Sequence, residues 1–412
     1  MKSLDSNQFL KPKLPNDLES SKIPEYSLEE GVERVLEIIQ EKLLTQKKPI
    51  IVEIAGGSAS GKTSTVAFKI KEALGDKALV LSMDNYCHEK SFIDNKNRNG
   101  ENINFDQPEA LNLELLKNHL IKLQQGKAIE KPIFDLKESK LKGQETIQPH
   151  RVIIVEGLFA LNNLIVKEGD IKVFVDVNAQ GRLLRRLFRD ITRSGKKSVE
   201  VLRYFLNTVE PMHDKHVQST ASNAGLIIRN GYDSKIEAKK LDLNEIQFKF
   251  KGEIDLENLQ KIGAKILTSV DQEDCYYSPN GVSLNEFGEI LRIRHENRHK
   301  ILTYKGPRLE SDLQIRSQFE FEIDDEIETK FSLIYGSPLK IIKKKCILYQ
   351  LNNIIFSIDD VFKIENEKET RIGKFIEIRS TNRNTDTEKI RDVILKLGLS
   401  IKDDLKKSYS EM

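Results

Sequence analysis

The stretch IVEIAGGSASGKTST, residues 51–65, decides the fold of the first half of this chain. It joins a β-branched, apolar run to the pattern Gly-x4-Gly-Lys-Thr, and the helix-forming segment TSTVAFKIKEAL overlaps its end. A strand, a glycine-rich loop and a helix in this order are typical of a loop that binds the phosphates of a nucleotide. The alternative is an ordinary glycine-rich turn between a strand and a helix.

The residue types of this loop suit phosphate binding. Glycines let backbone N–H groups turn towards phosphate oxygens, and the N-terminus of the following helix adds partial positive charge. Lys62 would reach the β- and γ-phosphates, and the Thr63 hydroxyl would ligate Mg²⁺. We therefore predict ATP and Mg²⁺ as cofactors. The predicted ATP-binding residues are Gly56, Gly57, Ser58, Ala59, Ser60, Gly61, Lys62, Thr63 and Ser64.

Two carboxylates follow later strands of the same region. ALVLSMDNY places Asp84 just past an apolar run, and RVIIVEGL does the same with Glu156. Ligands of open α/β sheets bind beyond the carboxyl ends of the strands, so both side chains would face the γ-phosphate. Phosphoryl transfer to an alcohol needs a group that accepts the hydroxyl proton, and carboxylates around Mg²⁺. Taken singly, each could instead be a turn or helix-capping residue.

Composition sets limits on the whole chain. Its 412 residues predict two or three domains, and a net charge of +2 gives no global attraction to nucleic acid or acidic lipid. The three cysteines form no CxxC pair, which favours a reducing compartment. The first residues lack the apolar core of a signal peptide, and no run of about 18 apolar residues occurs. We predict a cytoplasmic protein without nucleic-acid or membrane partners; the oligomeric state stays open.

Patterning divides the chain. Apolar β-branched runs alternate with helical segments in the first half, which predicts a parallel α/β sheet with helices on both faces. Period-2 alternation in the second half predicts an antiparallel sheet or barrel in an α+β domain. The predicted parts are a flexible arm over residues 1–26, a nucleotide-binding domain over 27–235, a linker over 236–244 and a barrel domain over 245–412.

A basic segment, GRLLRRLFRDITRSGKK, lies between these parts. Its arginines at 182, 185, 186 and 189 fall at helical spacings. Such a run is usually a solvated helix face. The alternative is a lid that closes over the transferred phosphoryl group and stabilises its charge.

Further motifs occur in a fixed order: GGSASGKTS, SMDNY, NFDQPEAL, KPIFDL, VIIVEGLFAL, GRLLRRLFRDI, VEPMHDKHV and AGLIIRN. Residues 48–232 therefore resemble the uridine kinase/phosphoribulokinase family of P-loop kinases. The resemblance implies that Asp84 accepts the proton of the acceptor hydroxyl, and that Thr63 and Glu156 form the metal site. The remaining candidates are Lys62 and Arg189 for catalysis, and Tyr86, Asp106, Phe134 and Arg185 for acceptor binding.

The chain departs from that family at the acceptor side. Uridine kinases carry Tyr in the block written here PIFDL and His five residues later, whereas this chain has Phe134 and Ser139. The basic segment has Ser194 and Lys196 where the family often has arginines. Phe134 can stack on a base but donates no hydrogen bond, so we predict broad or inefficient use of pyrimidine nucleosides.

The second half resembles the CYTH, or triphosphate tunnel, family. Its motifs are EIQFKFK, QEDCYYSP, ILRIRHE, ILTYKGP, RSQFEFEI, FSIDDV, GKFIEIRS and KSYSEM. The resemblance implies a closed barrel whose inward charges bind a polyphosphate and a divalent metal; without it, mixed charges on one strand face would indicate a solvent-exposed face. The predicted tunnel residues are Glu245, Lys249, Arg292, Arg294, Lys305, Glu320, Glu322, Lys343, Asp359 and Glu377.

Two departures affect the tunnel, because Gln247 and Arg379 stand where the family usually has glutamates. We therefore predict that it binds pyrophosphate, tripolyphosphate or a nucleoside triphosphate but hydrolyses them poorly. For the whole chain we predict an ATP-dependent uridine or cytidine kinase of pyrimidine salvage. The alternatives are a metal-dependent pyrophosphatase or triphosphatase in the tunnel, and a nucleotide sensor without catalysis. A metal site at His213 and His216, in MHDKH, is a further alternative.

Overall fold

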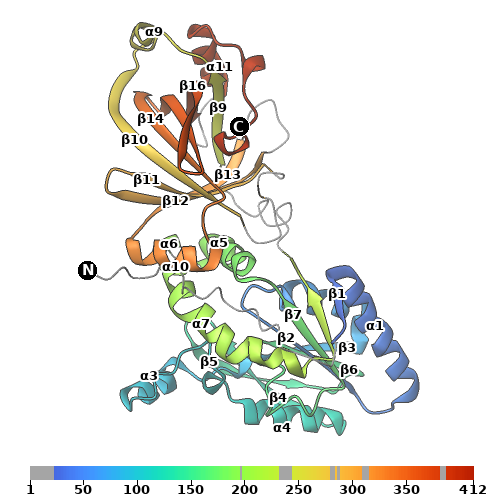
Figure 1. Ribbon diagram of the computed structural model, residues 1–412. Helices are drawn as coiled ribbons and strands as arrows, with labels where there is room; N and C mark the ends of the chain where they lie inside the picture. Colours follow the sequence, from blue (N-terminus) through green and yellow to red (C-terminus); the bar gives the residue numbers. More distant parts are fainter. Residues whose placement is uncertain are drawn as a thin grey trace. The chain divides into compact units, whose positions relative to one another are not determined.

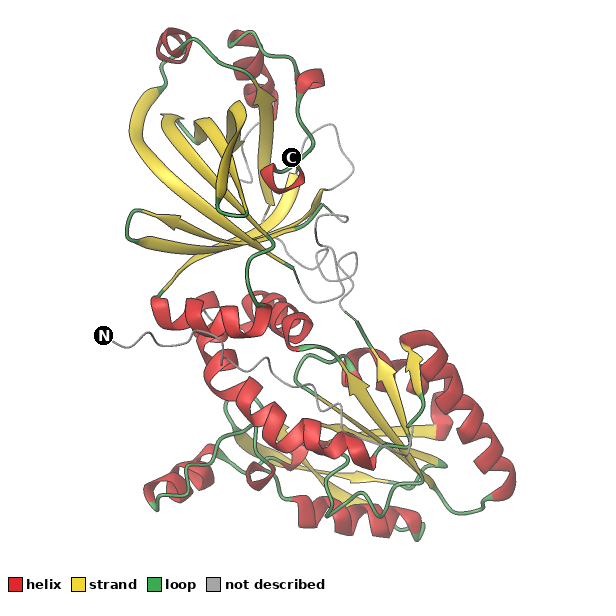
Figure 2. Cartoon of the chain, in the orientation of Figure 1, coloured by secondary structure: helices red, strands yellow, loops and turns green. Residues whose placement is uncertain are grey.

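The computed structural model describes residues 23–194, 197–231, 244–278, 284, 288–308, 315–380 and 387–412. These residues form two compact units (Figures 1 and 2). Unit 1 runs to Gly56 and adds Gly61–Asp176 and His216–Asn230. Unit 2 comprises Gly57–Ser60, Val177–Lys215 and the chain from Gly231 onward. The basic segment thus shares a compact unit with the second half of the chain, whereas the predicted domain limits would separate them. Most of the predicted arm and linker lies outside the described residues.

Unit 1 is built on a parallel sheet with the strand order β1-β8-β7-β2-β6-β3. Its central strands are buried along their whole length, which explains the uninterrupted apolar runs of the sequence. The predicted α/β sheet is confirmed. The strands are β1 (Glu25–Ser27), β2 (Ile50–Gly56), β3 (Ala78–Ser82), β6 (Val152–Gly157), β7 (Ile171–Asp176) and β8 (Leu226–Arg229).

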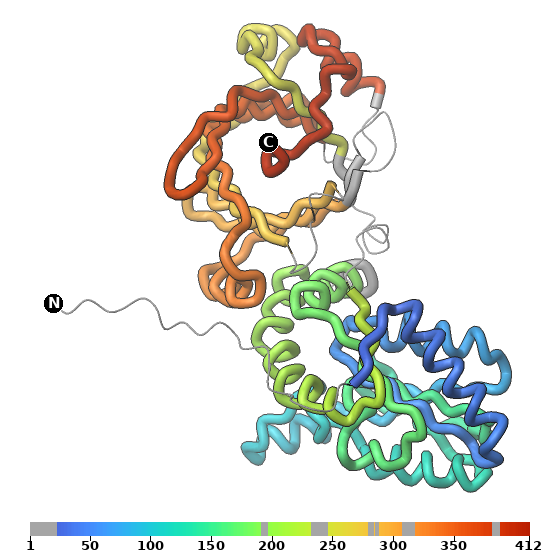
Figure 3. The backbone as a smooth tube through the Cα atoms, turned by 45° about the vertical axis from the view of Figure 1, so that its right-hand side comes forward, coloured from blue at the N-terminus to red at the C-terminus, as the bar shows by residue number. Residues whose placement is uncertain are grey.

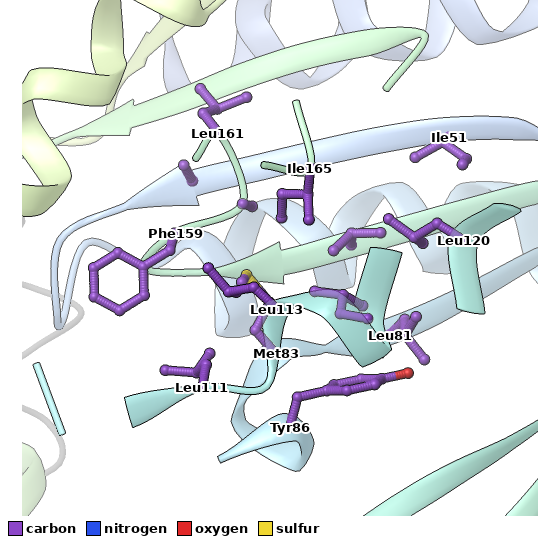
Figure 4. Close-up of a cluster of buried hydrophobic side chains, with 14 of the residues drawn as sticks. Ile51, Leu81, Met83, Tyr86, Leu111, Leu113, Leu120, Phe159, Leu161 and Ile165 are labelled. Atoms are coloured by element: carbon purple, nitrogen blue, oxygen red, sulfur yellow. The ribbon is translucent and has the colours of Figure 1, made fainter. Parts of the chain in front are cut away.

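Side chains alternate along the central strands, so that each strand contributes to two apolar clusters, one on each face of the sheet. Ile50, Val52 and Ile54 of β2 belong to one cluster, while Ile51 and Ala55 belong to the other. The first cluster includes α1 (Leu28–Thr45) and α2 (Phe68–Leu74), and the second, drawn in Figure 4, includes α4 (Leu113–Gln124). Helices therefore cover both faces of the sheet. The remaining elements of this unit are α3 (Lys90–Arg98) and the hairpin of β4 (Ile129–Asp135) and β5 (Lys140–Ile147).

Unit 2 contains a closed antiparallel barrel with the strand order β10-β11-β12-β13-β9-β16-β15-β14. Figure 3 looks along this barrel and shows the C-terminal segment at its mouth. The predicted barrel is confirmed. Its strands are β9 (Asn244–Lys251), β10 (Lys265–Tyr277), β11 (Ile290–Glu296), β12 (His299–Arg308), β13 (Ile315–Ile323), β14 (Lys340–Leu351), β15 (Ile354–Glu365) and β16 (Lys368–Ser380).

Helices cover the outer face of the barrel. One apolar cluster joins the wall to α9 (Leu256–Lys261) and α11 (Thr387–Lys396). Another joins it to α5 (Ala179–Ser194), α6 (Ser198–Tyr204) and α10 (Asp325–Tyr335), and α7 (Glu210–Met212) continues from α6. Among the described residues, no helix combines the length and the apolar character needed to cross a bilayer.

Candidate active site and charged tunnel

The glycine-rich loop has the backbone that its sequence demands. Gly61 has φ +84°, a conformation that residues with a side chain rarely adopt, and a Cβ there would lie 2.4 Å from the Asn230 amide nitrogen. The N–H groups of Thr65 and Val66 both donate to the Gly61 carbonyl, which starts the helical turn Lys62–Ala67. No side chain caps this turn at Gly61. A glycine-rich loop that runs directly into a helix N-terminus is the arrangement that the predicted phosphate site requires.

A hydroxyl and a carboxylate meet at the end of this loop. The Thr63 hydroxyl donates to Oε2 of Glu156 at 2.5 Å, and Glu156 is buried at the carboxyl end of β6. β6 pairs directly with β2, which leads into the loop. Oxygen ligands of these two kinds suit a hard divalent cation. The geometry of this pair therefore fits the predicted Mg²⁺ site.

Asp84 lies on a short helical turn, Met83–Tyr86, that follows β3. Its side chain is exposed, and its backbone N–H is capped by the Ser82 hydroxyl at 3.4 Å. The next residue, Asn85, accepts a hydrogen bond from the backbone N–H of Phe134 at 3.3 Å. The turn that carries the predicted base is thereby tied to the hairpin that carries the predicted base-stacking residue.

The other acceptor-side residues lie around this turn. Phe134 is buried on β4, and Ser139 occupies the β4–β5 turn with φ +52°. Asp106 is half-buried, and its N–H bonds to Asn104 at 2.9 Å. Phe134 is thus largely buried, and the position of the family's histidine falls in a turn.

Tyr86 corrects the prediction that it binds the acceptor. Its ring is 1% exposed, and its hydroxyl bonds Nδ1 of His119 at 3.0 Å. Figure 4 shows it in the cluster that contains Leu81 and Met83. Burial raises the pKa of this phenol above its ordinary value. Tyr86 therefore packs in the apolar core beneath the turn of Asp84.

The arginines of the basic segment differ in what they contact. Arg186 donates to the Ser58 hydroxyl of the loop at 2.8 Å. Arg182 is 3% exposed and pairs with Glu210 at 2.5 Å, and a Cβ on Gly57 would lie 2.7 Å from its Cδ. These two arginines pack against the loop, so this face of α5 is not simply solvated.

The predicted catalytic Arg189 and the predicted acceptor-binding Arg185 make other contacts as well. Arg189 is 39% exposed in its side chain and pairs with the adjacent Asp190 at 2.7 Å. Arg185 donates to the carbonyl of Gly231. The contact with the Ser58 hydroxyl thus belongs to Arg186. The side chain of Ser194 and the whole of Lys196 lie outside the described residues.

Of the two histidines in MHDKH, His213 packs against the glycine-rich loop. A Cβ on Gly57 would lie 2.9 Å from the His213 ring, so the ring supports the loop. Among the described residues, the potential metal ligands that come within 4.8 Å of one another are Glu273, Cys275 and His295. Neither His213 nor His216 belongs to that group, and the geometry gives the alternative of a metal site there no support.

Inside the barrel, Asp274 is one of the residues that the sequence did not single out. It is fully buried, and both of its oxygens accept bonds from arginines: Arg292 at 2.8 Å, and Arg294 at 2.6 and 2.9 Å. The Lys344 ammonium lies 3.8 Å away. Burial alone would raise the pKa of Asp274, but Arg292 and Arg294 outweigh it and hold that pKa well below the ordinary range.

A second buried group of charges involves the C-terminal segment. Lys249 pairs with Glu377 at 3.1 Å, and its ammonium lies 3.4 Å above the Tyr409 ring centre. The Tyr409 hydroxyl donates to Asp359 at 3.0 Å, and Lys344 lies 3.7 Å from the same carboxylate. Burial lowers the pKa of Lys249 to about 8, although Glu377 opposes the shift. Tyr409 thus closes one part of the tunnel wall.

The departures from the family pattern also line the tunnel. Gln247 accepts a hydrogen bond from Lys305 at 3.0 Å, and Arg379 lines the same cavity. Glu320 lies 3.7 Å from Arg292. Burial would raise the pKa of Glu320, but Lys305 and Arg292 lower it overall. Arg379 therefore points into the tunnel, on the same wall as Gln247.

Lys343 corrects another prediction. It lies on the outer side of β14, where it approaches Glu273 and Glu369 at 3.7 and 4.0 Å, and the next residue, Lys344, enters the tunnel. Glu322 is exposed and contacts His299 at 2.6 Å. The side chain of Glu245 is not among those described.

Comparison with known proteins agrees with both halves. The model of the phosphoribulokinase/uridine kinase family matches residues 51–237, and the CYTH domain model matches residues 243–409. Uridine kinases of Listeria monocytogenes serotype 4a and Alkaliphilus metalliredigens are 35% and 36% identical over 192 residues, which are 46% of this chain and 91% of each relative. The uridine kinase of Staphylococcus epidermidis is 37% identical over 189 residues, 45% of this chain and 90% of that protein. The C-terminal half therefore matches the CYTH domain model, and the chain belongs to the phosphoribulokinase/uridine kinase family.

Proposed function

We propose that the first half is an ATP-dependent nucleoside kinase that phosphorylates uridine or cytidine to the 5′-monophosphate. The observation that carries this proposal is the pair of Thr63 and Glu156, 2.5 Å apart at the end of a glycine-rich loop. Relatives named uridine kinase match this half over nine-tenths of their own length, which supports the acceptor class.

Each residue would have a distinct role. The backbone of the loop and Lys62 would hold the β- and γ-phosphates, and Thr63 and Glu156 would hold Mg²⁺. A bound Mg²⁺ supplies positive charge that offsets the charge of the phosphate oxygens. Asp84 would accept the proton of the attacking hydroxyl, for which its exposed position after β3 leaves room. Arg186 would add charge beside Ser58.

We propose loose selection of the acceptor. A site that hydrogen-bonds the base rejects wrong bases strongly, because a mismatch leaves buried polar groups unpaired. Phe134 supplies a ring but no hydroxyl, and Ser139 sits in a hairpin turn. Pyrimidine nucleosides should therefore be used with low efficiency or modest preference. We place this activity in the cytoplasm, in pyrimidine salvage, which agrees with three cysteines that form no disulfide.

We propose further that the tunnel binds an inorganic polyphosphate or a nucleoside triphosphate. Six cationic side chains of the barrel strands line it, and they outnumber the lumen carboxylates in the described part of the barrel. These cations are Lys249, Arg292, Arg294, Lys305, Lys344 and Arg379. The carboxylates Asp274, Asp359 and Glu377 are each within 4.0 Å of such a cation. They are therefore poorly placed to take a metal as well, so binding without efficient hydrolysis is the expected behaviour.

A panel of nucleosides tests this proposal. Purified full-length protein is incubated with ATP, Mg²⁺ and each nucleoside in turn, and the nucleoside monophosphate is quantified. We expect product with uridine and cytidine, and less discrimination against purine nucleosides than a strict uridine kinase shows. No monophosphate from any nucleoside would overturn the kinase assignment. Strict and efficient use of uridine would overturn only the loose selection.

A further inference from the structure

Strands β11, β12 and β13 of the barrel carry charge on one face and apolar groups on the other. Arg292, Arg294 and Lys305 line the tunnel. The residues between them in sequence, such as Ile293 and Tyr304, are fully buried on the outer side of the wall. Because side chains alternate along a strand, a displacement of the wall by a ligand moves both faces together.

The outer face of this wall is buried against α5. Leu183, Leu184, Leu187 and Phe188 of α5 are at most 1% exposed and belong to the same apolar cluster as the wall. The ring centre of Phe188 lies 4.8 Å from that of Tyr304. Closely packed interiors transmit displacements, since a shift on one side cannot be absorbed by empty space. The helix and the wall should therefore move as one body.

Polar contacts fix the same arrangement. The Gln180 amide of α5 donates to the carbonyl of Ile334 at 2.8 Å, and the Tyr335 hydroxyl of α10 donates to the Gln180 carbonyl at 3.1 Å. Arg203 of α6 pairs with Asp324 at 2.5 Å. These bonds define the angle of α5 and α6 against the barrel, beyond what apolar contact alone would specify.

The opposite side of α5 reaches the phosphate loop. Arg186 bonds Ser58, and Arg182 fills the space beside Gly57. The loop residues Gly57–Ser60 belong by their contacts to the same compact unit as α5 and the barrel. One helix therefore links the wall that carries the tunnel cations to the loop that is proposed to hold ATP.

We propose that a polyphosphate bound in the tunnel is an effector of the nucleotide site, and that α5 carries the effect. The inference rests on the proposed function of both sites. A polyanion that pairs with Arg292, Arg294 and Lys305 at once would restrain the strands whose outer face supports Phe188. Because α5 already contacts the loop here, a ligand that holds the wall holds α5 in the loop-engaged position. We therefore expect each ligand to strengthen the binding of the other.

Reciprocal binding tests this without any need for catalysis. Tripolyphosphate is titrated calorimetrically into the full-length protein, with and without a saturating non-hydrolysable ATP analogue and Mg²⁺. Coupling between sites commonly amounts to roughly fivefold or more in affinity, and we expect a decrease of that order in the tripolyphosphate Kd. In Lys62→Ala, which weakens analogue binding at the loop, the analogue should leave this Kd unchanged.

A matched pair of variants tests the route. Phe188→Leu removes the ring that packs against Tyr304 and should reduce the coupling to below about twofold. Phe356→Leu makes the same change at an equally buried phenylalanine on β15, in the cluster that faces α11, and should keep the coupling. Thermal melts check that both variants fold, and equal coupling in the two folded variants would overturn α5 as the route.

The remaining outcomes separate the two proposals. Tripolyphosphate binding with the same Kd in the presence and absence of the analogue would overturn the coupling and leave the tunnel ligand standing. Absence of tripolyphosphate binding in both titrations would overturn the tunnel ligand and the coupling together. Weaker binding that persists in Lys62→Ala would show competition inside the tunnel and would also overturn the coupling.

Discussion

The glycine-rich loop and the tunnel use different groups for the same class of ligand. The loop offers backbone N–H groups and the single lysine Lys62, with one hydroxyl–carboxylate pair beside it. The tunnel offers side-chain cations, several of which are buried and paired with carboxylates before any ligand arrives. Removal of one side chain at the loop should therefore affect mainly turnover. Removal of one side chain in the tunnel should affect mainly stability, because its partner is left charged and buried.

Two buried carboxyl groups, one on a strand of each unit, differ in their hydrogen-bond partners. Glu53 of β2 and Asp274 of β10 are both fully buried. Neither oxygen of Glu53 has a hydrogen-bond partner among the described residues, and burial raises its pKa to about 9. Asp274 has two arginines, and its pKa is lowered. Burial by itself thus decides neither protonation nor role; the partners do.

The largest effect is expected for Asp84→Asn. This change removes the proposed proton acceptor and keeps the shape of the side chain, so nucleoside phosphorylation should fall by about 10³-fold. Binding of ATP should change little. The measurement is steady-state formation of nucleoside monophosphate, with Asp94→Asn on the exposed face of α3 as the control. Phosphorylation at the wild-type rate in the folded Asp84 variant would remove this residue from the mechanism.

Lys62→Ala should follow in size. It removes the point charge that would hold the β- and γ-phosphates, and turnover should fall by about 10²- to 10³-fold. Tripolyphosphate binding in the tunnel should be unchanged, because the tunnel cations all belong to the barrel half of the chain. Lys69→Ala, an exposed lysine on α2 that pairs with Glu29 at 3.4 Å, is the control. An equal loss of kinase turnover and of tripolyphosphate binding would contradict the existence of two separate sites.

For the tunnel we expect a stability effect. Asp274→Asn leaves Arg292 and Arg294 buried without their counter-charge, and this should lower the free energy of unfolding by about 3 kcal/mol. Asp360→Asn, at a partly exposed pair with Arg371, should cost less than about 1 kcal/mol. Urea unfolding of both variants checks this. A loss for Asp274→Asn no larger than for Asp360→Asn would show that the buried network contributes nothing.

The sequence predicted the backbone better than the side-chain partners. Strand–loop–helix order and period-2 alternation are local signals, and the α/β sheet and the barrel follow from them. Tyr86 shows the limit, since nothing local distinguishes a ring that faces a ligand from one that meets His119, 33 residues away in sequence. The arginine that meets Ser58 could not be chosen among four at helical spacing without the position of the loop.

Three consecutive lysines in IIKKKCILY posed a similar problem. The phase of β14 is set by its pairing with β10, which places Lys344 opposite Gln272 and Lys343 opposite Glu273. A shift of one residue exchanges inside and outside, so Lys343 was wrongly assigned to the tunnel. Asp274 had a usable signal, because it shares the phase of the buried Tyr276 in QEDCYY and pairs with Arg294 of β11.

Restoring the family carboxylates should convert part of the binding into hydrolysis. Gln247→Glu together with Arg379→Glu adds two negative oxygen ligands near Glu377, and Mn²⁺- or Mg²⁺-dependent release of phosphate from tripolyphosphate should rise about tenfold. Phosphate release by wild type and variant is compared at several metal concentrations. Brisk metal-dependent release by the wild type, with no gain in the double variant, would show that these departures do not limit the tunnel.

The smallest effect concerns pH. Lys249 has a pKa of about 8, below the ordinary lysine value, so it loses its charge in the folded protein as the pH rises from 7 to 9. Loss of one of several cations should weaken tripolyphosphate binding a few-fold over this interval. Lys249→Arg keeps the charge and should flatten the profile. The same slope in both proteins, measured at constant ionic strength, would assign the pH dependence to another group.

The fate of labelled phosphate tests the central claim, which is that the loop transfers phosphate while the tunnel only binds it. The full-length protein is given γ-labelled ATP, Mg²⁺ and uridine, and a second portion of the same sample receives tripolyphosphate and Mg²⁺ alone. We expect label in uridine monophosphate in the first reaction and almost no phosphate release in the second. Rapid release of phosphate from tripolyphosphate, with no labelled monophosphate from ATP, would contradict this account.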